Sequence, residues 1–161
     1  PQLAVNAFGL GTGAFAVLQV CSVATFMVAA SQSGRISKRL GAPGAIRLGA
    51  GLHVLLCGLL VISAAIGRLP FAALVVFWCG FCGALAVRGP ASFSEALALP
   101  PSQMGRASAL LMLAILLVGA LGTQAVAPFM GGSSPVPLAS AMLLMCALAL
   151  WLVSPYPKTR G

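Results

Sequence analysis

Long apolar runs follow one another along the chain, and polar residues stand almost only between them. The runs cover residues 8–31, 48–66, 71–99, 107–129 and 138–153. A helix needs about 20 mostly apolar residues to cross a bilayer, so each run predicts one membrane-spanning helix. The third span is expected to be kinked at 89–90, because Pro90 removes a helical hydrogen bond. The runs lack the apolar–polar alternation of barrel strands. We therefore predict an all-α fold, a polytopic transmembrane helical bundle of five spans.

Composition excludes most classes of soluble protein. Of the 161 residues, 60% are hydrophobic and 6% are charged, whereas a soluble domain carries about 25% charged residues. There is too little polar surface for a cytosolic enzyme domain, a disordered tail or a secreted disulfide scaffold. We expect neither an enzyme nor a cofactor. The net charge of +8 could suggest nucleic acid. Because the cations are spread between apolar runs, we expect a lipid bilayer and no nucleic acid as the partner.

The cations also predict how the chain is oriented. If successive spans alternate in direction, only Arg68 falls on one side of the membrane. The other side receives Arg35, Lys38, Arg39, Arg47, Arg88, Arg106, Lys158 and Arg160. Because an excess of cations marks the cytoplasmic side, we expect a cytoplasmic loop at 32–47 and a cytoplasmic tail at 154–161. The protein is predicted to be multi-pass in the cell (inner or plasma) membrane. The odd number of spans and the first residue, Pro1, suggest a piece of a longer protein.

Three polar residues inside the spans are candidates for a substrate cavity. Gln19, His53 and Gln124 each lie within an apolar run. An unpaired amide in hydrocarbon is costly, so these side chains are expected to face a cavity and not lipid. His53 could instead be a hydrogen-bonded packing residue. Cys57 follows His53 by one turn, but no carboxylate is near them, and we predict no metal site.

The cysteines offer a second candidate chemistry. Residues 78–82 (Trp-Cys-Gly-Phe-Cys) match the pattern of thioredoxin-like redox sites letter for letter. In those sites the first cysteine lies at a helix N-terminus, which activates the thiol. Here the pair falls inside a span, and no βαβ pattern surrounds it. We therefore favour Cys79 and Cys82 as small buried apolar residues.

Charged residues predict a gate at the cytoplasmic side. Arg88 and Glu95 are seven residues apart, which puts them on one face of a continued helix. Glu95 is the only acidic residue in the chain, and its expected partners are Arg35 and Arg39. These four residues would form a charge latch, or else they are ordinary flanking charges of a solvated loop.

Two stretches of the chain resemble the major facilitator superfamily. Residues 34–41 (Gly-Arg-Ile-Ser-Lys-Arg-Leu-Gly) are similar to the loop signature between the second and third spans of each half of these transporters. Residues 89–110 look like the connection between spans ten and eleven of the drug-efflux members. The chain most resembles the bicyclomycin and chloramphenicol resistance (Bcr/CflA) group of drug:proton antiporters, as spans eight to twelve of twelve. Lys38 departs from the pattern, because the family has an aspartate there.

The resemblance implies part of a secondary active transporter. Such a protein would export drugs or other small molecules by proton antiport and alternating access. The chain would then be a C-terminal half, and the proton-carrying carboxylate would belong to the missing N-terminal half. The alternatives are a sugar or metabolite exporter of the same superfamily, a membrane scaffold subunit, or a membrane thiol oxidoreductase.

Overall fold

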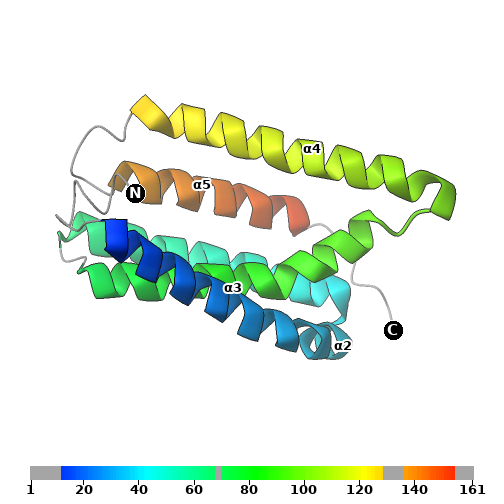
Figure 1. Cartoon of the computed structure of the whole chain (residues 1–161), viewed down its shortest axis with the longest axis horizontal. Helices are drawn as coiled ribbons and strands as arrows, with labels where there is room; N and C mark the ends of the chain where they lie inside the picture. The colour runs from blue at the N-terminus through cyan, green and yellow to red at the C-terminus, as the bar shows by residue number, and fades with distance from the viewer. Residues whose placement is uncertain (1–11, 68–69, 129–135, 155–161) are drawn as a thin grey trace.

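The chain folds into helices throughout the part that the structure describes. The computed structural model describes residues 12–67, 70–128 and 136–154, and no strand occurs in these ranges. The helices are α2 (Thr12–Ala65), α3 (Phe71–Ala96), α4 (Pro101–Val126) and α5 (Val136–Val153) (Figure 1). The all-α prediction is confirmed. All four helices are long and apolar enough to cross a membrane, which is compatible with a multi-pass membrane protein.

The first two apolar runs are joined in α2, which is broken at one residue. Gly41 has φ 72° and ψ 164°, a combination that is essentially restricted to glycine. The segments on either side, 12–40 and 42–65, run in opposite directions (Figure 1), and we call them the first and second arms of α2. Residues 32–47, expected to form a loop, are helical except at Gly41. Gln, Arg and Lys are good helix formers, so the first arm continues through this polar stretch.

The prolines set where α3 ends and α4 begins. Pro90 lies inside α3, and the helix changes direction over its last turns (Figure 1). The helix ends at Ala96, before the expected residue 99, since Pro100 disfavours helical backbone in the residue preceding it. The next helix begins with Pro101 in its first turn, where a proline needs no hydrogen-bonded N–H. It therefore starts before the expected residue 107.

Small side chains allow α2 and α3 to pack closely. Ala45, Ala50, Ala84 and Ala91 are almost completely buried. A Cβ atom added at Gly49 would lie 2.6 Å from the Cβ of Arg88 and 2.9 Å from the carbonyl oxygen of Ala84. Only glycine therefore fits at this crossing. Apolar side chains gain little by moving from lipid to a helix interface, so helices in membranes associate through close van der Waals packing. Small residues allow the two backbones to approach closely enough for this packing.

One helix stands apart from this bundle. In α4 no residue is buried, and Leu116 is 70% exposed. The helix lies beside α5, whereas α2 packs against both α3 and α5 (Figure 1). An apolar helix without a buried face needs an apolar surrounding, which is either lipid or another part of a protein.

Candidate functional site

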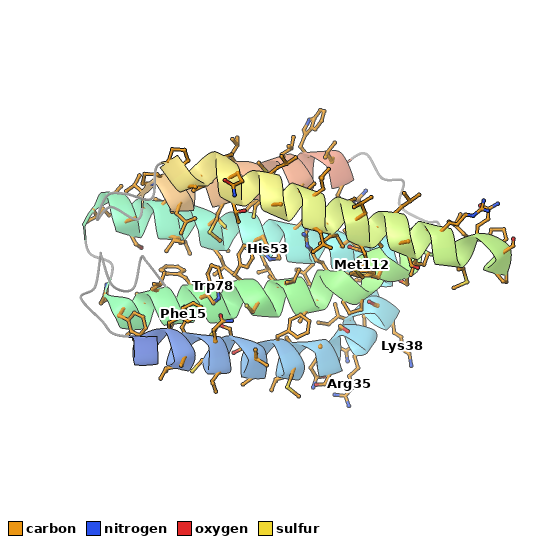
Figure 2. The ribbon with its side chains drawn as sticks, turned by 45° about the horizontal axis from the view of Figure 1, so that its top comes forward. Phe15, Arg35, Lys38, His53, Trp78 and Met112 are labelled. Atoms are coloured by element: carbon orange, nitrogen blue, oxygen red, sulfur yellow. The ribbon has the colours of Figure 1, made fainter. Side chains whose placement is uncertain are left out.

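A buried histidine lies between the second arm of α2 and α3. His53 is 3% exposed, and its Nδ1 donates a hydrogen bond to the carbonyl oxygen of Gly49 at 2.8 Å. The ring of Phe81 lies edge-on to the imidazole with 4.2 Å between centroids, and Trp78 stacks on Phe81. Figure 2 shows the imidazole between the two helices. Of the predicted cavity residues, only His53 is inside the bundle.

A cation lies beside this histidine. Arg88 is half-buried on α3 and packs against Gly49, whose carbonyl binds His53. Arg88 also lies within electrostatic range of both His53 and Cys146. The interior of the bundle thus holds positive charge and no acidic side chain among the described residues, because the only acid of the chain, Glu95, is exposed at the end of α3.

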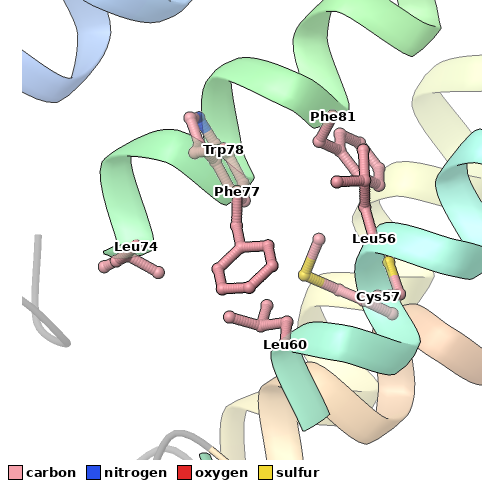
Figure 3. A pocket seen from close by; sticks show the side chains of 8 residues that line it. Leu56, Cys57, Leu60, Leu74, Phe77, Trp78 and Phe81 are labelled. Carbon is pink, nitrogen blue, oxygen red and sulfur yellow. The ribbon is translucent and has the colours of Figure 1, made fainter. Parts of the chain in front are cut away.

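Two thiols meet one helical turn further along α2. The sulfur atoms of Cys57 and Cys146 are 3.8 Å apart, and they join the second arm of α2 to α5. Cys57 is 2% exposed, Cys146 is half-buried, and both are free thiols. Cys57 also lines a small pocket beside Phe77 and Phe81 (Figure 3).

An open groove separates α4 from α5. Its volume is about 750 Å³, and it is lined by the C-terminal part of α4, the N-terminal part of α5, and Phe81 of α3. The lining is mostly apolar, with the hydroxyl groups of Thr123 and Ser140 as polar groups. Both hydroxyls donate hydrogen bonds to carbonyl oxygens of their own helices and can still accept a bond from a ligand. A mostly apolar cleft of this size with few polar groups is typical of small-molecule sites.

Most of the described cations gather at one end of the bundle, which we call the basic end. It comprises the Gly41 turn, the C-terminal ends of α3 and α5, and the N-terminal end of α4 (Figure 1). Figure 2 shows Arg35 and Lys38 beside the Gly41 turn, pointing away from the bundle. The cations carried by these segments are Arg35, Lys38, Arg39, Arg47 and Arg106, whereas Arg88 lies inside the bundle against Gly49. Arg68, Lys158 and Arg160 lie outside the described residues. The groove lies towards the opposite end.

The structure does not bring the four predicted gate residues into a latch. Glu95 is exposed, and within the described ranges no basic side chain lies within 4.0 Å of its carboxylate. Arg35 is also exposed and donates a hydrogen bond to Gln32 of its own helix at 2.8 Å. Arg39 is exposed, and Arg88 faces Gly49. A latch involving Glu95 therefore needs a partner from another conformation or another part of the protein.

The two glutamines are separate from the histidine. Gln19 is exposed on the first arm of α2, and Gln124 is exposed on α4. Neither lines the groove or the small pocket. They are exposed on an apolar bundle, where an amide needs a polar partner.

The thioredoxin-like cysteines lie in the middle of a helix. Cys79 and Cys82 are half-buried, free thiols within α3. Cys79 comes two turns after the start of α3 at Phe71, so it lacks the helix N-terminus that activates such a thiol. Among the described residues, no three His, Cys, Asp or Glu side chains are grouped closely enough to hold a metal ion.

Sequence analysis missed the pairing of Cys57 with Cys146 and the role of Gly49. The two cysteines are 89 residues apart in the chain, and no local pattern marks them as neighbours. The glycine had a weak signal, because Gly49 and Gly51 both lie inside an apolar run. Only the packing against Arg88 distinguishes the two.

Comparisons of the chain with protein-family models, with curated proteins and with solved structures found no match.

Proposed function

We propose that the chain is part of a secondary active transporter that exports lipophilic small molecules across a cell membrane. The observation that carries this proposal is the apolar groove between α4 and α5, together with an α4 that has no buried residue. A helix that only anchors a protein in lipid has no need of a cleft of about 750 Å³ at its side. A wall of a translocation pathway needs both a cleft and a face left free for the opposite wall.

The two arms of α2 support a bundle of five passes. Each arm is long enough to cross the hydrocarbon layer at 1.5 Å per residue, and the arms run in opposite directions (Figure 1). Counting the arms with α3, α4 and α5 then gives five passes. The basic end would be cytoplasmic, because cytoplasmic loops carry the excess of Lys and Arg. The groove would then lie in the outer half, where an exporter releases its substrate.

The transport cycle we propose is alternating access of this bundle against a second one. The major facilitator superfamily, and within it drug:proton antiport, is the proposed type, on the resemblance of residues 34–41 and 89–110. A proton-carrying carboxylate would come from the second bundle, since Glu95 is exposed near the basic end. Lipophilic substrates would contact the apolar groove, with Thr123 and Ser140 accepting hydrogen bonds from them.

Transport by the intact protein in proteoliposomes tests this proposal. An imposed proton gradient should drive movement of at least one of two probes, the lipophilic cation ethidium or the neutral drug chloramphenicol. A Gly122→Trp variant should lose most of this transport, because Gly122 lines the groove and a Cβ there meets no atom within 4 Å. The matched control is Leu116→Trp, on the same helix but away from the groove. The proposal would be contradicted if the gradient drove transport of neither probe. It would also be contradicted if the Gly122→Trp and Leu116→Trp variants transported equally well.

A further inference from the structure

We propose that Cys57, Cys146 and Met142 form a binding site for a soft, monovalent metal ion such as Cu(I). The two thiol sulfurs are already 3.8 Å apart, on helices from distant parts of the chain. With the zinc–sulfur bond length of about 2.3 Å as a guide, a linear thiolate–metal–thiolate unit places its sulfur atoms roughly 4.6 Å apart. Small side-chain rotations of the two cysteines would provide this separation. This site is additional to the proposed transport function and does not depend on it.

A methionine supplies a third soft donor. Met142 precedes Cys146 by one turn of α5, so the two side chains share a face of that helix. It lines the small pocket together with Cys57, and it lines the groove together with Cys146. Met142 therefore lies beside both cysteines. Soft thiolate and thioether ligands favour Cu(I), zinc and iron–sulfur clusters over the harder metal ions.

The surroundings exclude the harder metals. Ca²⁺ and Mg²⁺ require several oxygen ligands, and the only carboxylate side chain of the chain is that of Glu95, on α3 near the basic end. A structural zinc ion needs four ligands, and among the described residues no three His, Cys, Asp or Glu side chains are grouped closely enough to hold a metal ion. Copper(I) is satisfied by two or three sulfur atoms.

Charge and access also fit a dithiolate complex. Binding breaks two S–H bonds, releases two protons to the solvent and forms two metal–sulfur bonds, with no change of oxidation state. The product carries one negative charge, and Arg88 lies within electrostatic range of Cys146 to balance it. Cys146 and Met142 line the open groove, which gives an ion a path to the buried Cys57.

The experiment measures Cu(I) bound by the full chain in lipid nanodiscs, in competition with a chromogenic Cu(I) chelator. The starting protein carries Cys21→Ser, Cys79→Ser and Cys82→Ser, so that only the paired thiols remain. One Cu(I) per chain is expected. Cys57→Ser or Cys146→Ser should weaken binding by at least roughly 100-fold, since even the loss of outer-sphere partners costs about 10–100-fold. Met142→Leu should weaken it about 10-fold, and the matched control Met145→Leu should not.

A second measurement keeps the test independent of folding in the cysteine variants. In the protein that retains both paired thiols, Ag(I), which does not change oxidation state, should protect them from a membrane-permeant maleimide. Three results would overturn the proposal. The first is that the protein with reduced Cys57 and Cys146 binds no Cu(I). The second is that Cu(I) binding survives the loss of either cysteine. The third is that the two cysteines, when the protein is isolated from membranes, are already joined as a disulfide.

Discussion

Replacing Gly49 by alanine should separate α2 from α3 at their closest crossing. The new Cβ would have to move from 2.6 Å to at least 3.4 Å from the Cβ of Arg88 to reach ordinary contact. Both Cβ atoms are fixed to the backbone, and the second neighbour is the backbone oxygen of Ala84. No side-chain rotation can therefore relieve the clash. The helices must move apart, and the buried alanines around the crossing lose contact.

The magnitude follows from two opposing effects. Overpacking of a close-packed site costs about 1–3 kcal/mol, whereas alanine gains up to about 1 kcal/mol over glycine in helix propensity. The net loss for Gly49→Ala is expected to be about 0–2 kcal/mol in the free energy of unfolding when the full propensity gain of about 1 kcal/mol is subtracted. The matched control is Gly51→Ala, two residues further along the same arm, where a Cβ meets no atom within 4 Å. It should be neutral or stabilising by up to about 1 kcal/mol.

The assay is reversible unfolding in mixed micelles, followed by tryptophan fluorescence. Trp78 is a suitable reporter because it stacks on Phe81 inside the bundle. The measured quantity is the difference in unfolding free energy between the two alanine variants. A Gly49→Ala protein as stable as the Gly51→Ala protein would refute the packing argument, since helix propensity alone predicts the same change for both.

Substitutions at three further positions test other features. Gly41→Ala should destabilise the protein by about 1–3 kcal/mol in the same assay, because an alanine is strained at φ 72°. The control is Gly34→Ala, at a helical position where an added Cβ meets no atom within 4 Å. An equal effect of the two substitutions would contradict this prediction. His53→Phe should lose only the hydrogen bond to Gly49, which lowers the free energy of unfolding by about 0.5–1.5 kcal/mol. His53→Ala should lower it further, since this substitution also leaves a cavity beside Phe81. Equal losses of stability would show that packing of the ring contributes little. Glu95→Gln in the intact protein should alter transport in proteoliposomes while membrane insertion is retained, and unchanged transport would remove Glu95 from the mechanism.

The sequence predicts the class of fold because hydrophobicity is a local property. The apolar stretch 138–153 coincides closely with α5, and the stretch 107–129 covers most of α4, which starts earlier, at Pro101. The boundary at Pro100–Pro101 also had a local signal, since proline favours the first turn of a helix. The break at Gly41 was harder to place, because the polar residues before it are compatible with either a helix or a loop.

The packing between helices could not be obtained in this way. Every span is apolar on all sides, so no face is marked as the one that meets a neighbour. The sequence identified His53 as a polar group inside the bundle, but it grouped Gln19 and Gln124 with it on the same grounds. Only the arrangement of α2 against α3 and α5 separates the buried histidine from the exposed amides, and only that arrangement joins Cys57 to Cys146.

The most direct test of the proposed function is whether water reaches the groove between α4 and α5. In the intact protein freed of its native cysteines, a Gly122→Cys variant places a thiol in the groove, and Leu116→Cys places one on the outer side of α4. A charged, membrane-impermeant thiol reagent is applied to both variants in membranes. The account predicts rapid modification at position 122 and little at position 116. Equal lack of reaction at both positions would show that lipid or protein fills the groove, and would contradict a translocation pathway there.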